Sequence, residues 1–242
     1  YIFDGETYRK FLRKREITQE LREAVLNGCQ GFAAFYQPVF AEDKKVPYGA
    51  EALMRFTSEK LGIISPAEFI PILEETGLII PAGRWMMREA MGKCSEIRKV
   101  LPGFRVSINI SQVQASKSDV IQDISAEMKR AGLSLEALIV ELTESDLLEQ
   151  NINEKHFLTE LKRMGISLAL DDFGTGYSNF HYLSELKPEI IKIDRSFTVK
   201  AVADEQEWTM IRKLYPEFTQ GYFWGKPCEY EEFMRKFTES RL

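Results

Sequence analysis

Residues 168–178 of the chain are Leu168-Ala169-Leu170-Asp171-Asp172-Phe173-Gly174-Thr175-Gly176-Tyr177-Ser178. The apolar run at the start predicts a buried strand, and the two glycines predict a sharp turn just beyond its end. The adjacent carboxylates of Asp171 and Asp172 repel each other unless a cation lies between them, and hard divalent cations prefer such oxygen ligands. Taken alone, the pattern is equally typical of a solvated turn after a core strand. Polar residues at other strand ends decide between the two interpretations.

The composition excludes several classes of protein. A length of 242 residues suits one large α/β domain. The formal net charge of -5 argues against a DNA-binding surface. Cys29, Cys94 and Cys228 form no CxxC pair, which predicts free thiols in a reducing compartment. Because no apolar run reaches the length of a membrane span and no signal peptide opens the chain, we expect a cytoplasmic segment without membrane insertion.

The first part of the chain predicts a connection and then a hairpin. Residues 1–17 are aromatic and basic and begin without Met, so we expect a linker or the tail of a preceding signalling domain plus a connecting helix, with one domain over 18–242. A helix is predicted over residues 18–26. Strands are predicted over 32–40 and 48–56, and the short charged link between them favours an antiparallel pair.

Strand and helix alternate along the rest of the chain. The predicted helices cover residues 65–77, 81–100, 120–131, 154–164 and 180–186, and the predicted strands cover 105–110, 138–142, 167–171 and 190–193. This alternation indicates parallel strands joined by crossover helices. The number of units favours a (βα)8 barrel of the TIM type over an open sheet.

Polar side chains recur where these strands end. They are Glu51, Asn109, Glu141, Asp171, Asp172 and Lys192. A βα barrel delivers the carboxyl ends of its strands to one face, so we expect these groups to converge there. Singly, Asn109 could cap the next segment and Lys192 could extend its amine to solvent. Burying so many carboxylates without a cation is costly, so the set favours a metal site.

A family resemblance follows from ordered motifs. Glu51-Ala52-Leu53-Met54-Arg55 resembles the signature of the EAL-domain family of cyclic-di-GMP phosphodiesterases. Further similar motifs are Tyr36-Gln37-Pro38, Ser107-Ile108-Asn109-Ile110-Ser111, Glu141-Leu142-Thr143-Glu144, residues 171–178, Lys192-Ile193-Asp194-Arg195-Ser196-Phe197 and Gln220-Gly221-Tyr222. The likeness covers about residues 18–237. It implies a modified TIM-type barrel whose first strand is antiparallel, in agreement with the predicted hairpin.

The resemblance also implies a metal-dependent reaction. One Mg²⁺ or Mn²⁺ ion would be held by Glu51, Asn109, Glu141 and Asp171, and a second by Asp171 with Asp172. Divalent cations lower the pKa of water and stabilise charge on the phosphodiester being cut. Lys192 would orient the attacking water.

Further roles implied by the resemblance concern the substrate and the assembly. Glu144 would support the loop after Asp172, which in the family shapes both the metal site and the contact of a homodimer. Gln37, Arg55 and Gln220 would contact cyclic-di-GMP. The expected product is the linear dinucleotide pGpG, formed in bacterial second-messenger signalling.

One family motif has no counterpart in this sequence. The family places a strand containing Ala-Glu-Gly-Val-Glu before Gln-Gly-Tyr, and its first Glu lies at the metal site. Residues 199–203 could be a degenerate copy, but too few residues would then separate two parallel strands. We prefer a helix over 198–214, in which Asp204-Glu205-Gln206-Glu207 makes a capping box before Trp208. The seventh strand is then absent.

Two explanations of the absent strand remain open. A barrel without one strand exposes two unpaired edges, so we expect an interruption of the chain between Lys213 and Phe218 and an eighth strand over 219–224. The domain is then a complete phosphodiesterase. If the strand is truly deleted, the chain is a degenerate relative that binds cyclic-di-GMP without cutting it or acts through protein contacts.

Overall fold

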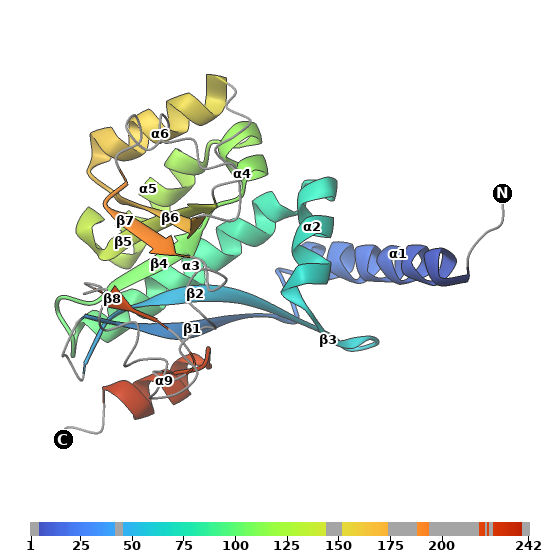
Figure 1. Cartoon of the computed structure of the whole chain (residues 1–242), viewed down its shortest axis with the longest axis horizontal. Coiled ribbons are helices and arrows are strands. Elements are labelled where there is room, and N and C mark those ends of the chain that lie inside the picture. Colours follow the sequence, from blue (N-terminus) through green and yellow to red (C-terminus); the bar gives the residue numbers. More distant parts are fainter. Residues whose placement is uncertain are drawn as a thin grey trace.

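A computed structural model describes residues 5–41, 46–143, 152–173, 188–193, 218–220, 222 and 225–238. A curled mixed sheet forms its centre, and helices pack along the sheet (Figure 1). Its strands follow the order β7-β6-β5-β4-β2-β1-β8, with β3 paired to β2. None of the helices in these ranges is both long enough and apolar enough to cross a membrane.

The first two strands form the antiparallel pair that the short link predicts. They are β1, Phe32–Ala41, and β2, Pro47–Ser58, and Gln37 lies opposite Glu51 in their register. A third strand that was not predicted, β3 at Gly62–Ile64, folds back antiparallel on the end of β2. The expected antiparallel first strand of the barrel is therefore confirmed.

The next strands are parallel, as the βα alternation predicts. Strand β2 pairs in parallel with β4, and the series continues through β5 and β6 to β7. Their bounds are Arg105–Asn109 for β4, Leu138–Thr143 for β5, Ser167–Phe173 for β6 and Ile190–Ile193 for β7. Parallel neighbours place their carboxyl ends at one edge, which is the edge where the polar residues were expected.

Strand β8, Phe218–Thr219, pairs antiparallel with β1 at the other end of the strand order. In the described part of the chain no strand joins β7 to β8. The expected chain interruption between Lys213 and Phe218 and the helices predicted over 180–186 and 198–214 lie outside the described residues. The eighth strand was predicted over 219–224, whereas β8 ends before Gln220.

The helices follow local signals. Helix α2, Pro66–Thr76, has Pro66 in its first turn, and Gly77 ends it in the left-handed conformation with φ of 73°. Three further predicted helices appear as α3, Ile79–Arg98, α5, Val120–Ala131, and α6, Ile152–Met164. A 3₁₀ turn at Leu135–Ala137 precedes β5.

Two helices were not predicted, and one of them corrects an alternative role for Asn109. Helix α4, Gln112–Lys117, is capped by Ser111, which forms a reciprocal capping box with Gln114. Asn109 is therefore not the cap of this segment. Helix α9, Tyr230–Phe237, packs against β1, where the rings of Phe233 and Tyr36 lie 6.3 Å apart.

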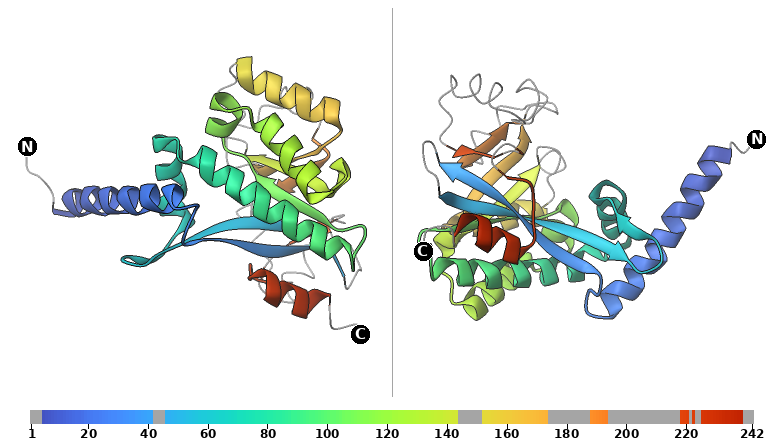
Figure 2. Two further views of the ribbon diagram at one scale, coloured as in Figure 1. Left: turned by 180° about the vertical axis from the view of Figure 1, so that it is seen from behind. Right: turned by 90° about the horizontal axis from the view of Figure 1, so that it is seen from below.

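Helix α1 combines two segments that were predicted separately, the connecting helix before residue 18 and the helix over 18–26. It runs over Gly5–Leu26 as one helix across the expected boundary at residue 18, and in all three views it points away from the other elements (Figures 1 and 2). Only Ile17, Leu21 and Ala24 are buried, whereas Tyr8 and Phe11 are exposed. The second half of α1 is therefore held by packing, and the first half projects.

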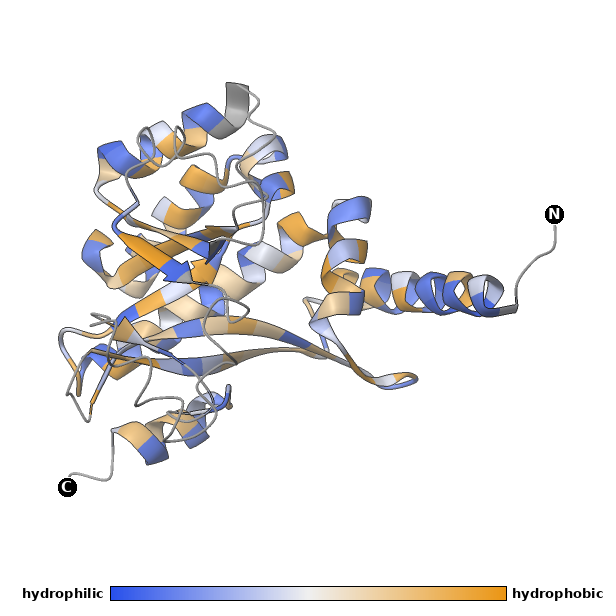
Figure 3. Cartoon of the chain, viewed as in Figure 1, coloured by the Kyte–Doolittle hydropathy of each residue, from blue (hydrophilic) through white to orange (hydrophobic). Residues whose placement is uncertain are grey.

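The buried side chains form two clusters. The larger one lies between the sheet and α3, α5, α6 and α9, and the smaller one joins α1, α2 and the adjacent ends of β1 and β2. Met54 and Trp85 pack against both clusters. Hydrophobic residues predominate in β5 and β7, whereas α1 is largely hydrophilic (Figure 3).

Candidate metal centre

Three carboxylates and one amine converge inside the curl of the sheet. Glu51, Glu141 and Asp171 come from β2, β5 and β6, and each offers an oxygen that lies within 4.8 Å of the oxygens of the other two. Glu51 and Glu141 are only 7% and 3% exposed. The parallel register explains the convergence, because Asn109 pairs with Glu141 and Thr143 pairs with Asp171 at the carboxyl ends of their strands.

The amine of Lys192, from β7, lies at the centre of this triad. Its Nζ is 2.9 Å from Glu51 Oε2, 2.7 Å from Glu141 Oε2 and 2.9 Å from Asp171 Oδ2. The sequence predicted Lys192 near the site but not its contact with all three acids. The ammonium uses its three donors on three carboxylates.

The pKa values of these groups follow from burial and mutual charge. Burial, together with the carboxylates of Glu51 and Asp171, raises the pKa of Glu141 to about 8. Burial also opposes the charge on Glu51, but Lys192 and two amide donors outweigh it, and the pKa of Glu51 is lowered. Burial works against the charge on Lys192 as well, yet the three acids raise its pKa well above the ordinary value. The amine therefore stays charged, and Glu141 is the acid of the triad whose ionisation burial and the neighbouring carboxylates oppose most.

A local irregularity in β6 sets the direction of Asp171. The pairing of β6 with β7 shifts register between Leu170 and Phe173. Within this shift Asp172 has a φ of 53°, a left-handed conformation that is uncommon outside glycine, and its N–H donates to Asp171 Oδ1 at 2.9 Å. Bulges of this kind commonly redirect a side chain beside a functional site. Asp171 thus joins the triad, whereas Asp172 is exposed and lies outside it.

Two amides hold Glu51 in place. Asn109 Nδ2 donates to Glu51 Oε1 at 3.0 Å, and Gln220 Nε2 donates to Glu51 Oε2 at 2.8 Å. The family resemblance implied a substrate contact for Gln220 but not this hydrogen bond with Glu51. No local signal could reveal it, because the two residues are 169 positions apart.

The remaining predicted residues have different placements. Arg55, on β2, is half-buried, donates to the Met54 carbonyl at 2.9 Å and lies with its guanidinium 5.6 Å from the centre of the Phe35 ring. Gln37 lies across from Glu51 on β1 and is partly exposed. The contact of Arg55 with Phe35 was not predicted, although side chains alternate along a strand and Phe35 therefore lies on the same face as Gln37. Glu144 lies outside the described residues.

The residues fit a hard divalent cation. Three carboxylates from separate strands provide an all-oxygen set, which Mg²⁺ and Mn²⁺ prefer, and no histidine or cysteine belongs to the group that the described residues form. Such burial of acids is costly without compensating charge. The amide of Asn109 donates to the Glu51 carboxylate, and its oxygen would be a further ligand for the cation at the edge of the site.

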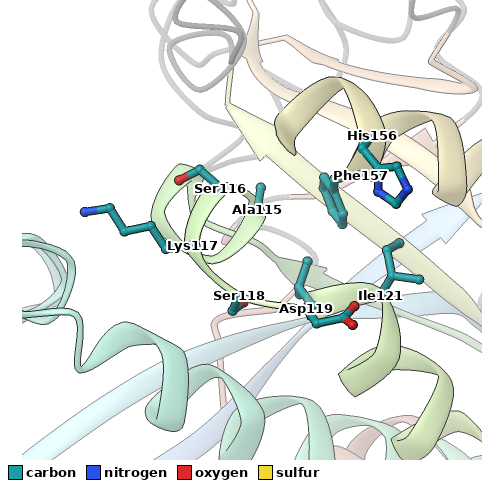
Figure 4. A pocket seen from close by; sticks show the side chains of 9 residues that line it. Ala115, Ser116, Lys117, Ser118, Asp119, Ile121, His156 and Phe157 are labelled. Atoms are coloured by element: carbon teal, nitrogen blue, oxygen red, sulfur yellow. The ribbon is translucent and has the colours of Figure 1, made fainter. Parts of the chain in front are cut away.

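A separate pocket of about 390 Å³ lies between α4, the start of α5 and α6. In Figure 4, His156 and Phe157 face Asp119 and Ile121 across it. None of the predicted site residues lines this pocket. The carboxylate triad is therefore the site that agrees with the sequence motifs.

Comparison with known proteins agrees with this arrangement. The family model of the EAL domain matches residues 18–205. The cyclic di-GMP phosphodiesterase PA2567 of Pseudomonas aeruginosa is 36% identical over 169 residues, which are 70% of this chain and 29% of that protein. The bifunctional diguanylate cyclase/cyclic di-GMP phosphodiesterase MucR of the same species is 30% identical over 217 residues, 88% of this chain and 31% of that protein. The chain therefore spans less than a third of either relative.

A solved structure of the PaMucR phosphodiesterase in complex with c-di-GMP matches with a TM-score of 0.83 and 26% identity, covering 90% of this chain and 99% of that one. The curled sheet, its antiparallel first strand and this neighbour identify the fold as a modified TIM-like barrel. Together with the family match over residues 18–205, these findings show that the chain belongs to the EAL domain family.

Proposed function

We propose that this chain hydrolyses cyclic-di-GMP to linear pGpG in a reaction that depends on Mg²⁺ or Mn²⁺. The observation that carries the proposal is the triad of Glu51, Glu141 and Asp171 gathered from three strand ends around Lys192. The names of PA2567 and MucR as cyclic di-GMP phosphodiesterases support the choice of substrate.

The chemistry divides between the cation and the protein. A bound divalent cation supplies a lowered pKa of water and neutralises charge on the phosphodiester. Glu51, Glu141 and Asp171 would hold one ion, with Asn109 at its rim, and Asp172 would serve a second ion together with Asp171. Lys192 would direct a lone pair of the attacking water toward phosphorus, as a P–O bond forms and one ester oxygen leaves with a proton.

Other residues would hold the dinucleotide. Arg55 would hold a phosphate through two hydrogen bonds, and the contacts of its guanidinium with the Met54 carbonyl and the Phe35 ring support this role. Gln37 and Gln220 would contact the substrate beside Glu51. Glu144 would support the loop after Asp172.

The setting of the domain is proposed from its relatives. We propose a domain over 18–242, with 1–17 as the connection to an upstream signalling domain, in a cytoplasmic homodimer. MucR, which carries two named activities and is about three times longer than the matched region, supports such a fusion.

A second candidate is a receptor that binds cyclic-di-GMP without cutting it. The observation that favours it is the absence of the Ala-Glu-Gly-Val-Glu motif from the sequence. The complete triad and Lys192 favour the enzyme, because a receptor has no need for convergent metal ligands.

One experiment separates the two candidates. The full chain is incubated with cyclic-di-GMP and Mg²⁺ or Mn²⁺, and products are resolved by chromatography, with a chelator-treated sample as control. Metal-dependent pGpG supports the enzyme. Binding of cyclic-di-GMP without product, measured by calorimetry, supports the receptor and contradicts our proposal.

A further inference from the structure

Lys192 holds one oxygen of each acid of the triad. The ammonium contacts one oxygen of each acid at 2.7 to 2.9 Å. The second oxygen of Glu51 accepts from Asn109, and the second oxygen of Asp171 accepts from the Asp172 N–H. A cation held by the three oxygens that Lys192 contacts would therefore compete with the ammonium for them.

The positive charge of the Lys192 ammonium also repels a divalent cation that enters the triad. One ammonium faces three carboxyl groups, so Lys192 neutralises the cluster only in part. Two cations cannot lie together among three oxygens within 4.8 Å of one another without strong repulsion. The residual negative charge attracts a divalent ion, and the ammonium resists it.

We propose that Lys192 is an internal counter-ion that holds the three acids together and competes with a divalent cation for their oxygens. This inference rests on the metal site of the proposed function and adds a determinant of metal affinity. Binding of the ion would move Nζ out of the triad to its edge. Lys192 would then lie beside the ion, where an amine can orient water.

The first test compares Lys192→Met with Lys129→Met, a control at an exposed lysine of α5. Both full-length variants and the wild type are stripped with a chelator and titrated with Mn²⁺ by calorimetry. We expect Lys192→Met to bind Mn²⁺ at least about tenfold more tightly than the wild type, because a competing charge is gone. Without metal, Lys192→Met should melt at a lower temperature than the metal-free wild type, because the three acids lose their counter-ion. Equal or weaker Mn²⁺ affinity overturns the proposal.

The second test uses the wild type alone and decides the matter if Lys192→Met does not fold. Acylation of each lysine by an amine-reactive reagent is followed by mass spectrometry with and without Mn²⁺. Lys192 should react several-fold faster when Mn²⁺ is bound, whereas Lys129 should keep its rate. An unchanged or slower rate at Lys192 overturns the proposal.

The two proposals fail in different ways. If Mn²⁺ affinity and Lys192 reactivity behave as expected but no pGpG forms, the proposed reaction is wrong and the counter-ion role stands. If pGpG forms while Lys192→Met leaves Mn²⁺ affinity unchanged, only the counter-ion role is wrong. If the wild type binds no Mn²⁺, both are overturned.

Discussion

The backbone at Asp172 decides which of two neighbouring acids enters the site. The sequence alone does not show which of the neighbouring carboxylates of Asp171 and Asp172 enters the site. Along a regular strand, the two side chains would point to opposite faces of the sheet. The register shift and the positive φ of Asp172 aim Asp171 at Lys192 and leave Asp172 at the rim. We therefore expect Asp171 to contribute more than Asp172 to the affinity for the proposed metal ion.

Substitution of Asp171 by Asn should abolish hydrolysis and largely spare folding. The amide keeps the shape but removes one anionic ligand, and the position is half-buried. Asp123→Asn, which alters an ion pair between α3 and α5, is the matched control and should keep its activity. Turnover is measured by pGpG formation and folding by circular dichroism. Wild-type turnover of the Asp171 variant contradicts the assignment.

Substitution of Arg55 by Ala should raise KM more than it lowers kcat. Its guanidinium is held by the Met54 carbonyl and the Phe35 ring, so it is oriented before substrate arrives. A lost charged hydrogen bond of about 2 kcal/mol corresponds to roughly a thirtyfold change in affinity. Arg84→Ala on α3 serves as control. An unchanged KM excludes the proposed phosphate contact.

Among the elements, α1 has two halves with different support. Its second half buries Ile17 and Leu21 in the smaller cluster, and Arg13 and Lys14 make ion pairs with Glu68 and Glu75 of α2. Surface ion pairs contribute little, so burial provides most of the attachment.

Leu21→Ala should therefore destabilise the fold, whereas Leu26→Ala in the same helix should not. Leu21 is 0% exposed and Leu26 is 83% exposed. Truncation of a buried leucine costs about 2–5 kcal/mol, and an exposed substitution is usually within about 0.5 kcal/mol. Both changes are measured by urea denaturation. Equal midpoints for the two variants show that α1 is not packed as described.

Helices α3 and α5 are joined by a carboxylate between two arginines. Glu127 accepts from Arg88 at 3.1 and 3.2 Å and also from Arg130. Burial opposes its charge, but the arginines outweigh burial and lower the pKa of Glu127. Because the folded value lies below the unfolded one, the stabilisation is present above the unfolded pKa and is lost as pH falls through the folded pKa.

Glu127→Gln should therefore be less stable than the wild type at pH 7 by about 1–3 kcal/mol. The difference should shrink below about pH 4, where the glutamate itself becomes neutral. Urea denaturation at several pH values measures the effect, with Glu16→Gln at an exposed position of α1 as control. A difference that does not change with pH contradicts the role of charge.

At the scale of the whole molecule, two hydrophobic clusters are joined through the strand that carries the site. Met54 and Trp85 pack against both clusters, and Trp85 lies 5.9 Å from Phe32 between ring centres. Met54 immediately precedes Arg55 on β2. The smaller cluster is thus connected to the strand that bears Glu51 and Arg55.

Trp85→Ala should destabilise both clusters together. The ring is partly buried, so we expect a loss of about 2–4 kcal/mol, at the lower end for an aromatic residue. Tyr8→Ala, which removes an exposed ring of α1, is the control and should be within about 0.5 kcal/mol. Scanning calorimetry measures both variants. Wild-type stability of the Trp85 variant shows that the clusters fold independently.

The sequence alone predicted most of the elements and the set of polar residues at the strand ends. Helix α5 and strand β7 were predicted with the bounds that the structure has, because hydrophobic periodicity and capping residues are local signals. The continuity of α1 across residue 18 was missed, because the exposed first half of the helix carries no hydrophobic periodicity. Helix α4 is only six residues long and was missed.

What only the tertiary structure decided is how those residues meet. Lys192 and Glu51 are 141 positions apart, and Gln220 and Glu51 are 169 apart, so their contacts depend on the order and curl of the strands. The separation of Asp171 from Asp172 depends on a bulge that arises from pairing with β7. The sequence determined which chemical groups are available, whereas long-range strand pairing determined their distances, and burial together with the neighbouring charges determined the direction in which each pKa shifts.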